Sequence, residues 1–240
     1  MGEGNGNPAL LAGKDELIMP FINSANIACG YHAGDAATMQ QTVELCVKYN
    51  VAIGAHPSYF DKENFGRSEI KLENAEVYDL VSQQLFILNE IVTGFDLKLH
   101  HVKPHGALYN MSAMDIKLAN TVARAVQDYD ASLILYGLSG SYSISEAKAI
   151  GLKTASEVFA DRTYQNDGSL TSRSQSNALI EDTDNAVQQV LQMINAGTIT
   201  TVSGKTIPII ADTICIHSDG KHAVEFAKAI HKAINGPGLE

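Results

Sequence analysis

The chain of 240 residues lacks the features of several common protein classes. It contains no tryptophan, and no apolar run approaches the length of about 20 residues that a membrane-spanning helix needs. Its N-terminus has no apolar stretch of the kind that forms a signal peptide. Basic residues number 17 against 27 acidic ones, so the formal net charge is −10 and nucleic acid is not an expected partner. We therefore expect a cytoplasmic protein that binds neither membranes nor nucleic acid.

Cysteine is also scarce. The three cysteines, Cys29, Cys46 and Cys215, have no metal-ligand spacing and lie in apolar surroundings, which predicts buried thiols in a reducing compartment. A Walker-type phosphate loop is absent as well. The run 203–206, Ser-Gly-Lys-Thr, lacks the upstream glycine spacing of that loop and lies in a predicted hairpin. No motif by itself therefore indicates a nucleotide site.

Short apolar runs alternate with amphipathic segments along the whole chain. The hydrophobic fraction of 45% suffices for one sizeable core, so we expect a single domain spanning residues 1–240. Residues 198–202 and 206–210 predict a small hairpin, and Asp35 is placed to cap a helix. The repeated strand–helix order favours an α/β fold with parallel strands. Six predicted strands are centred on Ile27, Ile53, Leu99, Ile134, Val158 and Ile214.

The third predicted strand and the turn after it carry an unusual set of ionisable side chains. Successive side chains of a strand point to opposite faces, so His101, Lys103 and His105 are expected on one face. Two imidazoles beside an ammonium group fill a hydrophobic core poorly. They suit a pocket that transfers protons and binds anionic groups.

Three further histidines follow short apolar runs. His32, His56 and His217 each come at the end of such a run. Any one of them alone is most simply a hydrogen-bonded structural residue. In α/β barrels, however, the carboxyl ends of the strands meet at one mouth, where active sites lie. Together these histidines predict a common site there.

Five segments of the chain carry distinctive motifs, at residues 24–35, 54–58, 101–110, 157–162 and 211–217. They resemble the motifs of a known family, LamB/YcsF, whose members are the A subunits of 5-oxoprolinase. The resemblance covers nearly the whole chain, in order, and implies a distorted seven-stranded β/α (TIM-like) barrel of the glycoside hydrolase/deacetylase type. Family members begin with a strand carrying Asp-x-Asn-x-Asp before a Gly-Glu pair. Here Met1 directly precedes Gly2 and Glu3, so we expect that first strand to be missing from this chain.

The resemblance also implies an activity. It is the ATP-dependent opening of the lactam of 5-oxoproline to L-glutamate, with ATP cleaved to ADP and phosphate, performed with two partner subunits. A homo-oligomer is a further expectation. Phosphorylating the stable amide would make its carbon more electrophilic before water attacks. Such chemistry needs cationic groups, a general acid or base and usually Mg²⁺.

The candidate residues follow from this chemistry. Histidines serve as proton carriers, Lys103 as a ligand for phosphate or carboxylate, and two acidic residues of one strand end could hold Mg²⁺ or polarise water. The catalytic candidates are His56, His101, Lys103, His105, Glu157 and Asp161. The candidates for binding substrate or phosphate are Asn26, His32, Arg162, Arg173 and His217.

Other interpretations stay open at this point. A metal-dependent deacetylase or sugar-acting hydrolase would use His32, His56 and His217 as metal ligands. A ligand-binding protein without turnover of its own is another alternative. Lys103 and Arg162 could also belong to a structural ion network. We expect Tyr109 and the residue after it to hold the turn that follows the His101 strand.

Overall fold

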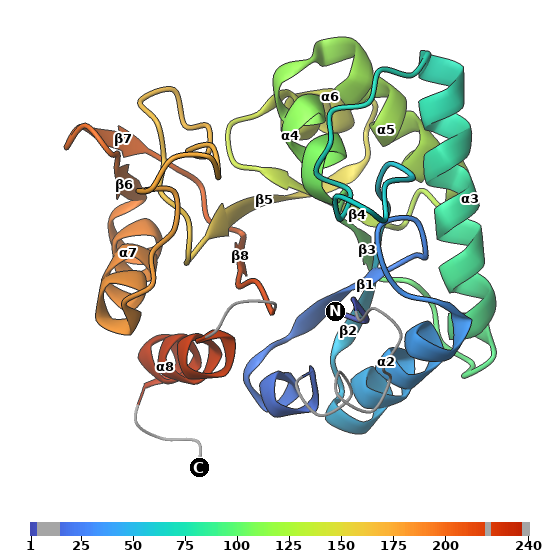
Figure 1. Cartoon of the computed structure of the whole chain (residues 1–240), viewed down its shortest axis with the longest axis horizontal. Coiled ribbons are helices and arrows are strands. Elements are labelled where there is room, and N and C mark those ends of the chain that lie inside the picture. Colours follow the sequence, from blue (N-terminus) through green and yellow to red (C-terminus); the bar gives the residue numbers. More distant parts are fainter. Residues whose placement is uncertain (4–14, 219–221, 237–240) are drawn as a thin grey trace. The chain divides into compact units, whose positions relative to one another are not determined.

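The computed structural model describes residues 1–3, 15–218 and 222–236 (Figure 1). Contacts divide the chain into two compact units. The N-terminal unit comprises Met1–Gly137 and Ser141–Ala155, and the C-terminal unit comprises Leu138–Gly140 and Ser156–Glu240. The single domain expected from composition stays a prediction. Within the described ranges, no helix is both long enough and apolar enough to cross a membrane.

The N-terminal unit alternates parallel strands with helices, as the sequence predicted. Its strands pair in the order β1, β2, β3, β4, and every pair is parallel. The strands are β1 (Ser24–Ala28), β2 (Ala52–His56), β3 (His101–Val102) and β4 (Ile134–Leu138). The helical segments are η1 (Met19–Phe21), α2 (Ala36–Tyr49), α3 (Asn74–Thr93), α4 (Gly106–Met114), α5 (Ile116–Tyr129) and α6 (Tyr142–Ala149).

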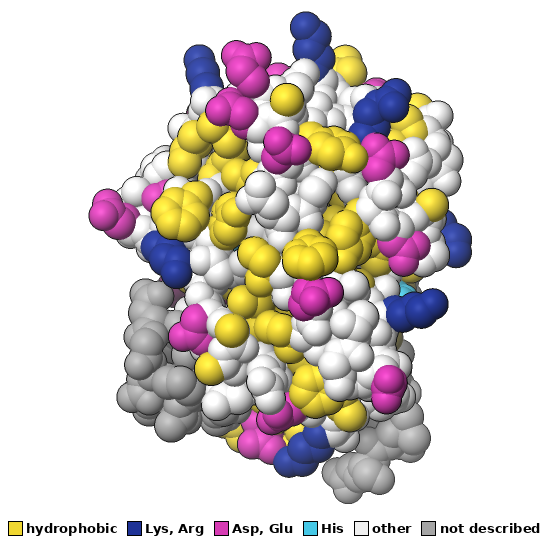
Figure 2. All heavy atoms as spheres, turned by 90° about the vertical axis from the view of Figure 1, so that its right-hand side faces the viewer, with side chains coloured by type: hydrophobic (Ala, Val, Ile, Leu, Met, Phe, Trp, Pro, Cys, Tyr) yellow, Lys and Arg dark blue, Asp and Glu magenta, His cyan; other side chains and the backbone are white. Residues whose placement is uncertain are grey.

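The hydrophobic core of this unit lies between the strands and the helices. Ile27 of β1, Val43 of α2 and Leu85 of α3 are completely buried within it. Figure 2 shows the outer face that includes α3, where hydrophobic side chains are scattered among acidic and basic ones. Phe86 of α3 is 58% exposed. Isolated apolar side chains of this kind are normal on a protein surface.

The C-terminal unit is smaller. It contains most of β5 (Lys153–Phe159), which pairs in parallel with β8 (Thr213–Cys215). The predicted hairpin is confirmed as the antiparallel pair β6 (Thr198–Thr200) and β7 (Thr206–Pro208). The remaining helices are α7 (Thr183–Ala196) and α8 (Ala223–Asn235).

Local signals account for several element boundaries. The Asp35 carboxylate accepts a hydrogen bond of 2.8 Å from the Thr38 N–H, so the predicted helix cap is confirmed. The six predicted strand centres all fall within a strand or, for Leu99, two residues before one. The sequence also predicts a short helical piece near Leu10 and Leu17. Leu17 lies in a helical turn at residues 15–18, whereas Leu10 lies outside the described residues.

The turn expected at Tyr109 is a wrong prediction. That residue lies inside α4 and is 5% exposed. His105 occupies the extended cap position and Gly106 begins the helix immediately. The buried side chains of Ala107 and Leu108 then give α4 a packed face. Residues 106–114 therefore form a helix of nine residues that the sequence pattern did not predict.

A close approach between β2 and a side chain of β3 explains one glycine. Gly54 pairs with Asn26 of β1 on one side and with His101 of β3 on the other. The His101 imidazole lies across Gly54, and its Nε2 is 2.9 Å from the Asn26 side-chain oxygen. A Cβ atom at position 54 would overlap the ring of His101. Only glycine leaves room for this cross-strand hydrogen bond.

We predict that Gly54→Ala lowers the free energy of unfolding by about 1–3 kcal/mol, because the added methyl group overpacks a buried site. Urea unfolding followed by circular dichroism measures the loss. The double variant Gly54→Ala/His101→Ala is the matched test, because it removes the ring that the methyl overlaps. If Gly54→Ala costs as much in the His101→Ala background as in the unsubstituted chain, the proposed overlap is not the cause.

Candidate functional site

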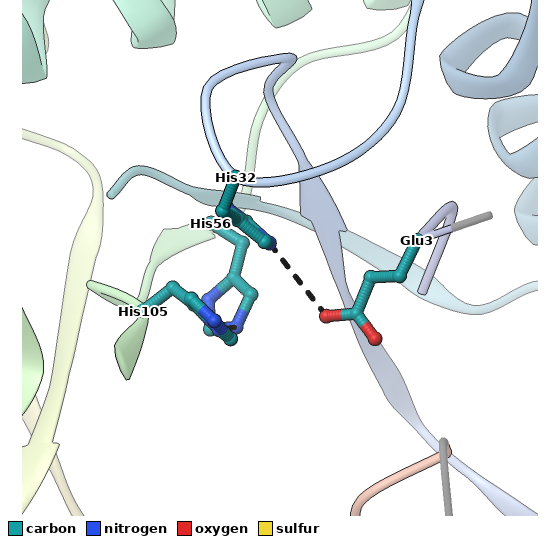
Figure 3. Close-up of side chains that lie close together, drawn as sticks. All are labelled: Glu3, His32, His56 and His105. Carbon is teal, nitrogen blue, oxygen red and sulfur yellow. Dashed lines mark hydrogen bonds and ion pairs between the residues drawn. The ribbon is translucent and has the colours of Figure 1, made fainter. Parts of the chain in front are cut away.

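Four ionisable side chains of the N-terminal unit, of which Glu3 is partly exposed and the others are buried, converge in a group that we call the histidine cluster: Glu3, His32, His56 and His105 (Figure 3). One potential ligand atom from each residue lies within 4.8 Å of all the others. His32 follows β1, His56 ends β2 and His105 immediately precedes α4. All three histidines are less than a tenth exposed. Each was a sequence-predicted candidate, and the structure brings the three together.

Glu3 reaches the cluster because the first residues run along the edge of β1. The Met1 N-terminal ammonium group donates to the Asn26 carbonyl at 2.9 Å, and the Ala28 N–H donates to the Met1 carbonyl at 3.1 Å. The Gly2 N–H donates to the buried Asp15 carboxylate at 2.8 Å. These backbone bonds fix the segment from which the Glu3 side chain points toward His32 (Figure 3).

The other histidines are positioned by a backbone ladder that continues beyond the strand ends. After β3, the Lys103 N–H donates to the Ala55 carbonyl at 2.9 Å, and the His105 N–H donates to the Pro57 carbonyl at 2.8 Å. This ladder holds the segment 103–105 beside the end of β2. His56 and His105 therefore become neighbours, with His56 Nε2 and His105 Nδ1 2.9 Å apart.

The loop after β2 completes the enclosure. The buried Gln84 amide of α3 accepts from the Ser58 N–H at 2.9 Å and donates to the Ser58 carbonyl at 2.8 Å. Further along, Phe65 has a φ of 57° and Gly66 a φ of 66°. This left-handed turn places the Phe65 carbonyl 2.9 Å from His105 Nε2. The loop therefore binds one histidine by its backbone and, through the Ser58 side chain, another.

Each histidine has an outer nitrogen that contacts a fixed acceptor. His56 Nδ1 lies 2.6 Å from the Lys103 carbonyl, and His32 Nδ1 lies 2.8 Å from the Ser58 hydroxyl oxygen. His32 Nε2 lies 3.7 Å from the Glu3 carboxylate. The rings of His32 and His105 stack face to face with their centroids 3.9 Å apart. The three imidazoles are thus held in fixed orientations.

Burial favours the neutral form of these rings. It lowers the pKa of His56 well below its ordinary value, and the neighbouring His105 and His32 lower it further. Burial and the nearby His32 likewise lower the pKa of His105 to about 3. Burial alone would raise the pKa of Glu3, but the N-terminal ammonium group and His32 hold it well below its usual range. The cluster therefore combines neutral imidazoles with a carboxylate near neutral pH.

His101 and Lys103 belong to a neighbouring region of the same unit. His101 contacts Asn26, as described above, and stacks on Tyr136 with ring centroids 4.1 Å apart. The Lys103 ammonium lies 5.5 Å from the centre of the Tyr109 ring, and Lys103 is 5% exposed. The charge of this buried ammonium contributes to lowering the pKa of His56 and of His101, and such a cation is suited to binding an anionic group.

The remaining candidates lie in the C-terminal unit. Because β5 and β8 pair in parallel, Asp161 and His217 come together beyond their ends, with His217 Nδ1 2.7 Å from the Asp161 carboxylate. Burial would raise the pKa of Asp161, but its bond to His217 lowers it. Glu157 of β5 is buried.

The two arginine candidates of this unit differ. The buried Arg162 guanidinium donates to the carbonyls of Thr171 and Ala178, at 2.6 and 3.3 Å, and so binds its own loop together. Arg173 is an exposed residue of that loop. Their expected role in binding phosphate stays a prediction.

Sequence reasoning overlooked Glu3, Ser58 and Gln84 as parts of the site. The Gly-Glu pair at residues 2–3 was a family marker, but no local pattern placed its carboxylate near a histidine. Ser58 follows His56 by two residues, and this spacing was the available signal. Gln84 lies within an amphipathic helix and is completely buried. A polar residue among the apolar positions of that helix was the available signal of a specific role.

Comparison with known proteins identifies a family model and relatives that match this chain over nearly its whole length. The model of the LamB/YcsF family matches residues 1–240. A protein of Tolumonas auensis, named as the A subunit of 5-oxoprolinase, is 53% identical over 228 residues, which are 95% of this chain and 91% of that protein. A Staphylococcus aureus protein of the same name is 49% identical over 240 residues, covering 100% and 95% of the two chains.

One solved structure is similar throughout. The lactam utilization protein from Thermus thermophilus has a TM-score of 0.89 and 36% sequence identity, and the match covers 100% of this chain and 95% of that one. The α/β fold expected from the sequence is thereby confirmed.

The pKa of His101 leads to a prediction about acid stability. Burial, followed by the nearby His100 and Lys103, lowers this pKa from 6.5 to about 3. As the pH falls below 6.5, His101 binds a proton in the unfolded chain but stays neutral in the folded chain. The stability contributed by His101 is therefore complete above pH 6.5 and is lost progressively down to about pH 3.

We expect the free energy of unfolding of the unsubstituted chain to fall by about 2 kcal/mol more than that of His101→Gln between about pH 7 and pH 5. Urea unfolding at the two pH values, followed by circular dichroism, provides the comparison. Equal losses in both proteins would show that His101 does not titrate in this way.

Proposed function

The chain belongs to the LamB/YcsF family, as its motifs predicted, and from this premise we propose that it is one subunit of an ATP-dependent 5-oxoprolinase. In this proposal the enzyme hydrolyses the lactam of 5-oxoproline to L-glutamate, ATP is cleaved to ADP and phosphate, and two other subunits take part. The names of relatives that are 53% and 49% identical over nearly the full length support the substrate.

The observation that carries the proposal is the buried group of neutral imidazoles next to the Lys103 segment. Activation by ATP places a phosphoryl group on the lactam oxygen, and a cation stabilises the negative charge of that group as its carbon is attacked. A neutral imidazole can accept the proton of the attacking water and later protonate the leaving nitrogen. The Lys103 carbonyl accepts from His56, so the same segment that holds the ammonium also orients the proton carrier.

The proposed reaction uses ATP because the lactam amide is difficult to hydrolyse. The amide of a five-membered lactam is stable and its nitrogen is a poor leaving group. Transfer of the γ-phosphoryl group of ATP to the amide oxygen would activate the carbon, and Mg²⁺ would accompany the nucleotide phosphates. Glu157 and Asp161 remain our candidates for holding Mg²⁺, and Arg162 and Arg173 for holding phosphate.

Three finer features belong to the same proposal. The first is the distorted seven-stranded β/α barrel implied by the family resemblance. The second is a cytoplasmic location, which the three buried free thiols of Cys29, Cys46 and Cys215 support because thiols persist in a reducing compartment. The third is a homo-oligomeric state.

We predict that the full chain, mixed with the two partner subunits, releases ADP in proportion to added 5-oxoproline and forms L-glutamate. The chain alone should not turn over. Coupled ADP detection and chromatographic measurement of glutamate test both products. Glutamate formation without ATP consumption would refute the ATP-dependent reaction. Full turnover by the partners without this chain would refute its part in catalysis.

We predict that Lys103→Met lowers kcat/KM of the assembled enzyme by at least about 100-fold, because a cation that stabilises developing negative charge is lost. Methionine keeps most of the aliphatic stem, and Lys103→Ala should be equally inactive. His231→Ala, in α8, is the control and should retain full activity. Thermal unfolding of each variant verifies folding, and an active, folded Lys103→Met protein would contradict the assigned role.

A further inference from the structure

The hydrogen bonds of the histidine cluster determine where its protons lie. Carbonyl oxygens only accept hydrogen bonds, so His56 Nδ1 must donate to the Lys103 carbonyl and His105 Nε2 to the Phe65 carbonyl. The Ser58 hydroxyl donates to the Tyr59 carbonyl at 3.0 Å, so its oxygen accepts from His32 Nδ1. All three rings therefore carry their proton on the outer nitrogen.

The inner nitrogens of the neutral rings are then lone pairs. His56 Nε2 and His105 Nδ1 face each other at 2.9 Å without a proton between them. His32 Nε2 is buried, makes no hydrogen bond within the described residues and faces the Glu3 carboxylate. Four acceptors thus point into one buried space, with no donor among these four groups. Such an arrangement is electrostatically unfavourable unless a cation lies among the acceptors.

We propose that the histidine cluster binds a divalent transition-metal ion through His56 Nε2, His105 Nδ1 and the Glu3 carboxylate. Two histidines and one carboxylate are a common ligand set for zinc and for non-haem iron. His32 is not assigned as a ligand. Its ring is parallel to that of His105, with an interplanar angle of 8°, and one ion cannot lie in the planes of two rings stacked face to face.

The surroundings of the three ligands match those of metal sites. A histidine that binds a metal almost always donates its other N–H to a carbonyl or carboxylate, which fixes its orientation. The Lys103 and Phe65 carbonyls accept these bonds from His56 and His105. Ligand atoms of a tetrahedral zinc ion lie about 3.4 Å apart, as follows from bond lengths of about 2.1 Å. Atoms that are already within 4.8 Å of one another need only small side-chain movements.

Protons are the alternative occupants. Two would be needed, one between His56 and His105 and one on His32 Nε2. This would bury two imidazolium groups against the single negative charge of Glu3, and the rings of His32 and His105 are stacked only 3.9 Å apart. A metal ion satisfies the facing lone pairs of His56 and His105 without placing charge on His32, whose buried Nε2 could accept a hydrogen bond from a water bound to the ion. An imidazole-rich site favours Zn²⁺ or Co²⁺ over Mg²⁺, which prefers oxygen ligands.

This inference goes beyond the proposed hydrolysis. A bound ion would occupy the lone pairs of His56 and His105, so His32 Nε2 would then be the nitrogen of the cluster that can accept a proton. A bound metal of this kind would polarise a carbonyl or lower the pKa of a bound water. The site is tested by metal binding to the chain alone, without substrate, nucleotide or partner subunits. Failure to bind metal would leave the lactam reaction standing, and failure of that reaction would leave the metal site standing.

The experiment uses the full chain, freed of metal with a chelator and dialysed. Competition with a chromogenic chelator measures its affinity for Zn²⁺, and visible absorption follows the addition of Co²⁺. We expect one ion per chain and a Co²⁺ spectrum characteristic of mixed nitrogen and oxygen ligands. The absence of saturable binding of both Zn²⁺ and Co²⁺ overturns the proposal.

Variants identify the ligands. We expect Glu3→Gln, His56→Gln and His105→Gln each to weaken Zn²⁺ binding by more than about 100-fold, whereas His32→Gln should weaken it by about 10-fold, because only a neighbouring contact is lost. His231→Gln, in α8, is the matched control and should bind as the unsubstituted chain does. A loss with His32→Gln as large as that with the three ligand variants would overturn the ligand assignment.

Nitrogen-15 spectra of the histidines in the unsubstituted chain provide a test that is independent of variant folding. Zinc should shift the resonances of His56 Nε2 and His105 Nδ1 and leave their outer nitrogens protonated. Spectra that show protons on those inner nitrogens, unchanged by excess zinc, would establish the proton-sharing alternative instead.

Discussion

Outward hydrogen bonds from three buried imidazoles are the constraint on which the candidate site depends. Each ring uses one nitrogen to donate to a fixed oxygen, and two of these oxygens are backbone carbonyls. The bonds compensate part of the cost of burying polar rings. They also prevent the rings from turning their donors inward. The reactivity of the cluster therefore follows from its backbone: the acceptors converge because the donors are held outside.

The parallel arrangement of strands makes this convergence possible. In the N-terminal unit, β1, β2 and β3 bring Asn26, Gly54 and His101 into one row across the sheet. The same alignment continues past the strand ends, where backbone bonds join the segment 103–105 to residues 55–57. Two histidines that are 49 residues apart in the sequence become direct neighbours because their strands are adjacent and end at the same level.

The sequence allowed much of the fold and part of the site to be predicted. Apolar runs and caps located the strands and most helices, since those signals are local. The grouping of His32 with His56 was also predictable, because residues at the ends of parallel strands meet at one edge. His217, which the same pattern grouped with them, lies in the C-terminal unit beside Asp161. Glu3 was missed because its position depends on hydrogen bonds between the first residues and β1, which no periodic pattern reveals. Helix α4 was missed because its first residues doubled as the turn after β3.

The glycines beside the cluster show why its motif contains residues that perform no chemistry. Gly66 has a φ of 66°, and a Cβ atom there would lie 2.9 Å from the His105 ring and 2.9 Å from His32 Cβ. Gly106 has a φ of 56°, and its Cβ atom would overlap the Gly66 carbonyl. Glycine is therefore required at both positions for the loop and the start of α4 to approach so closely. That approach lets the Phe65 carbonyl reach His105. Each residue of the Pro-His-Gly sequence therefore has a backbone role. Pro104 has no N–H to extend the hydrogen-bond ladder with residues 55–57. His105 is extended, and the positive φ of Gly106 lets the chain turn into α4.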